Sequence, residues 1–167
     1  METITENINL INDNKRINNE FKIKVIFLDF NGVLDTFENM NEVDSINLNI
    51  LKEIIRETNA KIVISSSIKN TYFYCGEHNR VMKYLIRVLE ENKIEIYGLT
   101  PWLENRELEI KKYLEEHPEI EEYCIIDDDY YFESMKEHMI KLEHQWLGTN
   151  GLQDIDKDNI IKILKRN

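Results

Sequence analysis

Three apolar runs of this chain each end in a polar tip, and this pattern constrains the fold more than any other feature. The run at 24–28 leads into Asp29, the run at 61–64 into three serines, and the run at 123–126 into three aspartates. Short apolar runs of this kind are typical of buried strands. In an open parallel sheet, ligands bind just beyond the carboxyl ends of the strands. The sequence therefore predicts one site where a carboxylate, a hydroxyl and an acidic cluster meet.

The segments between these runs have helical periodicity. Apolar residues recur at helical spacing after Asp44 or Ser45, one of which is the predicted N-cap, and this helix carries Ile46 on its apolar face. Further helices are predicted at about 79–91, 103–116, 132–137 and 156–165, and further strands at 94–97 and within 139–142. Strands that alternate with helices favour crossover units. We expect a single doubly wound, Rossmann-like α/β domain with a mainly parallel sheet over residues 21–167, after a loosely ordered polar arm at 1–20.

The composition restricts the partners. The 167 residues carry a formal net charge of -11, which opposes non-specific binding to nucleic acid and to anionic membranes. No apolar run has membrane-spanning length, and the N-terminal segment lacks the apolar core of a signal peptide. We therefore expect a cytoplasmic protein with no membrane partner.

Asp29 has two interpretations. A carboxylate at a strand end can attack phosphorus to form an aspartyl-phosphate, and it can also ligate Mg²⁺. Alternatively, Asn31-Gly32 between apolar pairs is a strong hairpin signal, which would make the segment a plain hairpin. We favour the catalytic interpretation because a hairpin explains neither the serines nor the aspartates. The acidic run at 127–129 strengthens it, since adjacent carboxylates repel and a divalent cation relieves that repulsion.

A phosphate site also needs hydroxyl groups and a fixed cation. Ser65 is the serine at the strand tip, and a hydroxyl beside exposed backbone N–H groups can hold phosphate oxygens. Lys69, just after the serines, and Arg106, near the start of a predicted helix, are the two candidate cations. Either side chain can instead be a solvated or surface-paired charge. We favour Arg106 and leave the choice open.

These residues resemble the motifs of the haloacid dehalogenase superfamily of phosphohydrolases over about residues 24–164. Within that superfamily the chain is most similar to the small domains associated with RNA-repair proteins. The matching segments are Asp29-Phe30-Asn31-Gly32-Val33-Leu34, Ser65, Arg106-Glu107-Leu108-Glu109-Ile110, Asp127-Asp128 and Gly151-Leu152.

The resemblance implies a Mg²⁺-dependent phosphomonoester hydrolase. Asp29 would be the nucleophile and a metal ligand, and Asn31 would offer its backbone carbonyl to the metal. By position, Asp128 would bind the metal, with Asp127 beside it. Ser65 would bind the phosphoryl group, and Arg106 or Lys69 would stabilise its charge.

One departure from the family pattern concerns Asn31, which stands where the family has an Asp that acts as general acid and base. An amide cannot transfer a proton as a carboxylate does. Turnover should therefore be slow or restricted to good leaving groups, unless a group such as Asp35 substitutes. The alternatives are a non-catalytic metal- and phosphate-binding or regulatory module, and a transferase or aspartyl-phosphate switch.

The chain also leaves no room for a large cap domain. The segment 35–44 is too short for a folded insertion, and ordinary crossover elements fill 67–120. The resemblance therefore implies an open site, which suits a phosphorylated macromolecule such as a polynucleotide end or a phosphoprotein.

Overall fold

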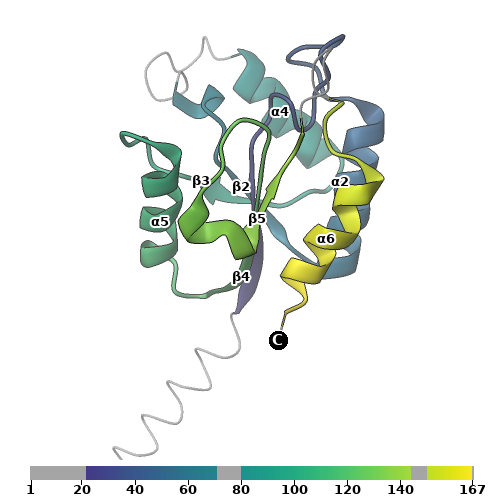
Figure 1. The fold of residues 1–167 in the computed structure, drawn as a ribbon. Coiled ribbons are helices and arrows are strands. Elements are labelled where there is room, and N and C mark those ends of the chain that lie inside the picture. Colours follow the sequence, from purple (N-terminus) through teal and green to yellow (C-terminus); the bar gives the residue numbers. More distant parts are fainter. Residues whose placement is uncertain (1–21, 71–79, 144–149, 167) are drawn as a thin grey trace, which may run out of the picture.

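The computed structural model (Figure 1) describes residues 22–70, 80–143 and 150–166. Five strands form one sheet in the order β3-β2-β1-β4-β5, and every neighbouring pair runs parallel. This confirms the predicted doubly wound α/β domain; the predicted arm lies outside the described residues. The elements are β1 (Ile23–Leu28), α2 (Ser45–Thr58), β2 (Lys61–Ile64), α4 (Arg80–Glu91), β3 (Ile96–Leu99), α5 (Arg106–Glu116), β4 (Ile120–Asp127), the 3-10 helix η2 (Glu133–His138), β5 (Met139–Lys141) and α6 (Asp154–Leu164).

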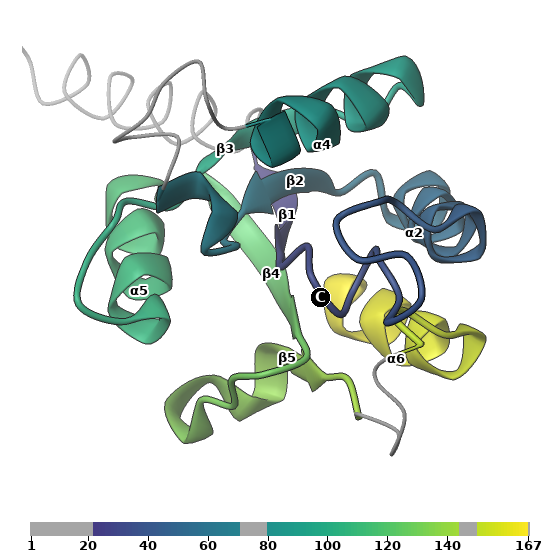
Figure 2. The ribbon, with the colours of Figure 1, turned by 90° about the horizontal axis from the view of Figure 1, so that it is seen from above.

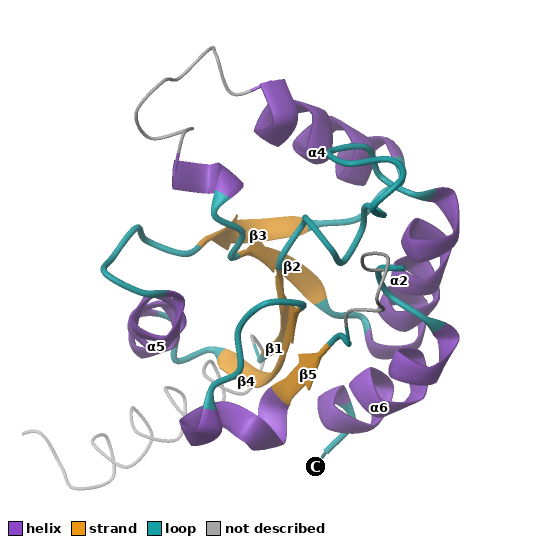
Figure 3. Cartoon of the chain, turned by 45° about the horizontal axis from the view of Figure 1, so that its top comes forward, coloured by secondary structure: helices purple, strands orange, loops and turns teal. Residues whose placement is uncertain are grey.

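Helices cover both faces of the sheet, as Figures 2 and 3 show. The alternation of β1 explains this arrangement. Ile26 and Leu28 pack into a core formed with α2, α4 and α6, whereas Val25 and Phe27 pack into a second core with α5 and η2. All four side chains are buried, which is why the strand reads as a continuous apolar run.

The register of the central strands brings the polar tips together. Leu28 pairs with Ile64 on one side and with Ile126 on the other. The residues that follow these three, Asp29, Ser65 and Asp127, therefore lie at one edge of the sheet. The hairpin interpretation of Asn31-Gly32 is wrong: residues 31–34 form a turn, and β1 pairs with β2 and β4 instead.

Several predicted boundaries were wrong by a few residues, for local reasons. The third strand begins at Ile96 instead of residue 94, because Lys93 adopts a left-handed conformation (φ 59°) and the Ile94 backbone N–H still bonds to the end of α4. The helix predicted from residue 103 begins at Arg106, because the Asn105 side chain caps it. Asp44 caps α2 as predicted.

Other differences are smaller. Ile46, predicted on the apolar face of α2, is 66% exposed. The strand predicted at 123–126 extends over Ile120–Asp127, and the last helix starts at Asp154. Among the described residues, no helix has the length and apolarity that crossing a bilayer requires.

Candidate active site

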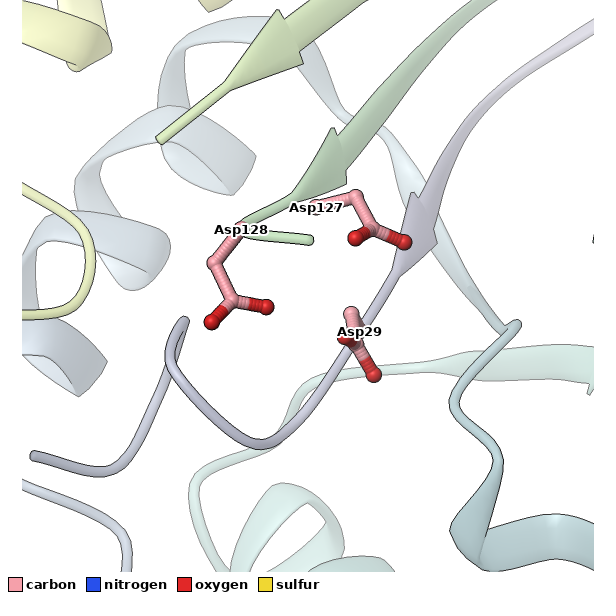
Figure 4. A group of neighbouring side chains, drawn as sticks. All are labelled: Asp29, Asp127 and Asp128. Carbon is pink, nitrogen blue, oxygen red and sulfur yellow. The ribbon is translucent and has the colours of Figure 1, made fainter. Parts of the chain in front are cut away.

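An acidic cluster lies at the carboxyl edge of the sheet. Asp29 follows β1, Asp127 ends β4 and Asp128 comes next in the chain (Figure 4). One oxygen of each carboxylate lies within 4.8 Å of the others, and all three side chains are buried. Like charges this close repel, so the cluster requires a cation.

Arg106 supplies a positive charge to two of these carboxylates. Its Nη1 lies 3.2 Å from Oδ2 of Asp29 and 2.5 Å from Oδ2 of Asp127. The Asn105 cap makes Arg106 the first residue of α5, and this position directs it to the sheet edge. Burial raises the pKa of Asp29, and the attraction of Arg106 opposes that rise. The guanidinium therefore favours the ionised carboxylate.

Asp127 and Asp128 differ in their surroundings. Oδ1 of Asp127 accepts hydrogen bonds from the backbone N–H groups of Asp129 and Tyr130, both at 2.9 Å, and its Oδ2 accepts from Arg106. Both oxygens of Asp127 are thus engaged in holding the turn and the guanidinium. Asp128 instead packs against Gly32, where a Cβ atom would lie 1.8 Å from Oδ2 of Asp128.

The serines divide in an unexpected way. The hydroxyls of Ser65 and Ser66 are buried and have no hydrogen-bond partner among the described residues. The hydroxyl of Ser66 still lies near enough to Asp29 to lower its pKa, although it misses regular hydrogen-bond geometry. Ser67 lines the cavity beside Asp29. Sequence reasoning singled out Ser65 and missed its two neighbours, for which the serine triplet itself was the signal.

The two candidate cations have different environments. Arg106 lines the cavity and contacts the acidic cluster. Lys69 is 1% exposed and pairs with Glu109, its Nζ lying 2.8 Å from Oε2. Glu109 also accepts a hydrogen bond from the backbone N–H of Leu103. Sequence reasoning missed Glu109 as a partner of Lys69, although it lies one helical turn after Arg106 in the quoted motif.

Asn31 and Asp35 organise the loop after β1. The Asn31 Nδ2 donates to Oδ2 of Asp35 at 2.8 Å and to Oδ1 of Asn41 at 3.0 Å. Asp35 also accepts from the backbone N–H groups of Gly32 and Asn41, at 2.5 and 2.7 Å. With three N–H donors, the Asp35 carboxylate is occupied in holding the loop closed and is poorly placed to move protons for a substrate.

A cavity of about 350 Å³ opens above these groups, a volume within the range of small-molecule sites. Its walls come from the loop after β1, the serine turn, the start of α5 and the turn after β4. The lining residues are Asp29, Asn31, Gly32, Asp35, Thr36, Phe37, Met40, Ser67, Arg106, Asp128, Asp129 and Tyr130.

The donor set fits a hard divalent cation. Carboxylate oxygens are the ligands that Mg²⁺ accepts, together with water and substrate phosphate. Asp29 and Asp128 both line the cavity, whereas Asp127 does not. Gly32 leaves space for the Asp128 carboxylate, because any side chain at that position would displace it.

The comparison with protein families agrees with this geometry. Residues 25–155 match the family model described as the HAD domain in Swiss Army Knife RNA repair proteins. Searches against curated proteins and against solved structures return no significant match. The match spans the sheet, the acidic cluster and the serine turn. The chain therefore belongs to the family of HAD domains found in Swiss Army Knife RNA repair proteins.

Proposed function

We propose that this protein is a Mg²⁺-dependent phosphomonoester hydrolase that acts through an aspartyl-phosphate on Asp29. The observation that carries the proposal is the position of Asp29. Its carboxylate stands at the end of the central strand, 3.2 Å from Nη1 of Arg106 and beside Asp128 in an open cavity. A nucleophile, a fixed cation and a metal ligand thus face the same space, as phosphoryl transfer requires.

Asp29, Asp128 and the backbone carbonyl of Asn31 would hold the metal. A bound Mg²⁺ supplies positive charge that brings an anionic phosphate close to an anionic nucleophile. Asp127 has a different task, because both its oxygens already accept hydrogen bonds. It orients Arg106 toward Asp29.

The first chemical step forms a bond between a carboxylate oxygen of Asp29 and phosphorus, while the ester P–O bond breaks. The leaving oxygen departs with the bonding electron pair. Arg106 balances the charge on the phosphoryl oxygens. Ser67 lines the cavity and can donate its hydroxyl to them, and the buried hydroxyl of Ser66 lies beside Asp29. In the second step, water attacks phosphorus, the bond to Asp29 breaks, and inorganic phosphate leaves.

These two chemical steps lack an obvious group for proton transfer. Asn31 cannot protonate the leaving oxygen or take a proton from water, and Asp35 is occupied by three N–H donors. With neither side chain available, we expect the leaving group to take its proton from solvent. General acid–base catalysis contributes roughly 10²- to 10⁴-fold to a rate. We therefore expect turnover to be slower by about that factor than it would be with a general acid at position 31.

The lack of a general acid at Asn31 and Asp35 also favours a second candidate, a non-catalytic module that binds metal and phosphate. A third, a transferase or switch, would keep the aspartyl-phosphate and hydrolyse it slowly. The proposal and the binding module differ in whether Asp29 reacts. Hydrolysis of para-nitrophenyl phosphate, with Mg²⁺ or with EDTA, separates them.

We expect wild type to hydrolyse this ester with Mg²⁺ and to stop with EDTA. Asp29→Asn should be inactive while its circular dichroism spectrum is unchanged. If wild type hydrolyses the ester no faster than a control without protein, while phosphate with Mg²⁺ still raises the Tm of wild type, the binding module is the better account.

A further inference from the structure

Apolar side chains border the cavity around Asp29. Phe37, Met40 and Tyr130 all line it, and they are 64%, 65% and 47% exposed. The guanidinium carbon of Arg106 lies 5.0 Å from the centroid of the Tyr130 ring, so this ring lies next to the cation of the site. Covering exposed apolar surface is favourable. This apolar rim, defined as Phe37, Met40 and Tyr130, suits a substrate with apolar surface next to its phosphate.

Two of the three rim residues, Phe37 and Met40, lie on the loop after β1, and hydrogen bonds close this loop. Phe37 and Met40 lie between Asp35 and Asn41, and the Asn41 backbone N–H bonds to Oδ2 of Asp35 at 2.7 Å. Asn41 itself adopts a left-handed conformation with φ 65°. These bonds close the loop between Asp35 and Asn41, and the closed loop places Phe37 and Met40 at the border of the cavity.

The missing general acid points to the same kind of substrate. An alkoxide is a strongly basic leaving group and needs a proton, whereas a phenolate leaves as a stabilised anion. Asn31 donates both its amide hydrogens within the loop, and Asp35 accepts three N–H groups. Asp129 is the remaining carboxylate of the cavity lining, and it is solvent-exposed.

We infer that the preferred substrates are aryl phosphomonoesters, in which the phosphate is attached directly to an aromatic ring. The inference rests on the proposed function of the same site. Two independent features support it: the rim offers a surface on which a ring packs, and the site lacks the acid that an alkyl ester needs. The net charge of -11 further disfavours a polyanion such as a nucleic-acid end. Phosphotyrosine in a peptide and a free small aryl phosphate share the required chemistry.

A substrate comparison tests this inference. Values of kcat/KM are measured with Mg²⁺ for phenyl phosphate, a phosphotyrosine peptide, the matching phosphoserine peptide and an oligonucleotide with a terminal phosphate. We expect both aryl esters to exceed both alkyl esters by about 100-fold or more. A higher kcat/KM for the phosphotyrosine peptide than for phenyl phosphate indicates a protein substrate. Equal values of kcat/KM indicate a small aryl ester. An oligonucleotide as good as the aryl esters would overturn the inference.

Rim variants separate binding from the intrinsic reactivity of aryl esters. Phe37→Ala should raise KM for phenyl phosphate by about 2- to 10-fold and leave KM for the alkyl esters unchanged. Ile46→Ala is the matched control, because Ile46 is 66% exposed and does not line the cavity. Asp129→Asn should leave the aryl-to-alkyl ratio unchanged; a fall in the alkyl rate alone would identify Asp129 as a general acid and overturn the argument.

Binding of non-hydrolysable analogues keeps the inference separate from the proposed function. Calorimetry with Mg²⁺ compares phenylphosphonate with methylphosphonate on wild type and on Phe37→Ala. If no ester is hydrolysed, the proposed function fails, yet tighter binding of phenylphosphonate that Phe37→Ala weakens still supports an aryl ligand. Equal affinity for the two phosphonates, or binding of neither, overturns the inference even if esters are hydrolysed.

Discussion

The side-chain Nδ2 of Asn31 donates a 2.8 Å hydrogen bond to Oδ2 of Asp35. The same nitrogen donates to Oδ1 of Asn41 at 3.0 Å. At the position where the resemblance to the haloacid dehalogenase superfamily implies an acid, this chain therefore has an amide that ties the loop together. A carboxylate at position 31 would lose both donors and would face the carboxylate of Asp35.

Asn31→Asp should consequently cost stability. The variant removes two hydrogen bonds and places two carboxylates side by side, so we expect the free energy of unfolding to fall by about 1–3 kcal/mol. Urea unfolding at neutral pH measures this change. Repulsion is relieved when one of the paired carboxylates is protonated, so the loss should shrink as the pH is lowered. A variant as stable as wild type would contradict the hydrogen-bond network described for the loop.

Exchanging the two side chains should restore the missing acid. Asn31→Asp/Asp35→Asn keeps one carboxylate and one side-chain amide with their positions reversed. The single amide oxygen at position 35 can replace only one of the two Asp35 oxygens that accept from Gly32 and Asn41. We expect this double variant to gain up to about 100-fold in rate on alkyl phosphates and less on aryl phosphates. Asp35→Asn alone is the control and should gain nothing. If the double variant is no faster on either class while it still binds Mg²⁺, proton transfer is not the limitation.

Mg²⁺ should stabilise the folded protein through Asp128. A ligand at 100 times its Kd raises the free energy of unfolding by about 2.7 kcal/mol, so the Tm should rise with Mg²⁺ concentration. Asp128→Asn should abolish the rise. Asp158→Asn, at an exposed position on α6, should retain it. An equal rise in wild type and in Asp128→Asn would place the cation elsewhere.

Gly32 should be needed for metal binding as well as for the turn. It has φ +74°, and a Cβ atom there would lie 1.8 Å from Oδ2 of Asp128. Gly151 is a matched control, since it has φ +67° and its Cβ would lie 2.0 Å from the Asn47 side chain. Both alanine variants should lose stability, but only Gly32→Ala should lose the Tm rise with Mg²⁺. Loss of that rise in both variants would indicate a general disturbance of the fold.

Lys69 should contribute to the stability of the fold, whereas Arg106 should contribute to phosphate binding. Lys69→Met leaves the buried Glu109 carboxylate without its ion-pair partner, which should lower the free energy of unfolding by about 3–5 kcal/mol, and Lys69→Met/Glu109→Met should recover part of this loss. The double variant should still bind inorganic phosphate with Mg²⁺. Arg106→Lys keeps the charge but loses the planar fork of donors, so it should weaken phosphate binding. If phosphate binding is weaker in Lys69→Met/Glu109→Met but unchanged in Arg106→Lys, Lys69 is the cation that binds phosphate. Urea unfolding and calorimetry supply the two readouts.

The central sheet could be predicted because its strands are buried on both faces. β1, β2 and β4 read as apolar runs, and the parallel register then places Asp29, Ser65 and Asp127 at one edge. The starts of β3 and α5 were less predictable. They depend on a left-handed Lys93 and on the Asn105 cap, which are conformations that apolar periodicity does not encode.

The details of the site depended on contacts between distant segments. Lys69 pairs with Glu109, forty positions along the chain, and no local pattern specifies that partner. Beyond a strand end the alternation of side-chain directions stops, so the orientations of Ser65 and Ser66 could not be predicted. The occupation of Asp35 by three donors likewise depends on the path of the loop to Asn41.

Detection of a phosphoryl group on Asp29 tests the central claim most directly. Wild type and Asp29→Asn are mixed with phenyl phosphate and Mg²⁺, quenched with acid, and digested for mass spectrometry. Because Asn31 cannot activate water, the aspartyl-phosphate should accumulate, and the wild-type peptide that contains Asp29 should gain the mass of one phosphoryl group while the variant gains none. Phenol released by wild type with no phosphoryl group on Asp29 at any time would contradict the account.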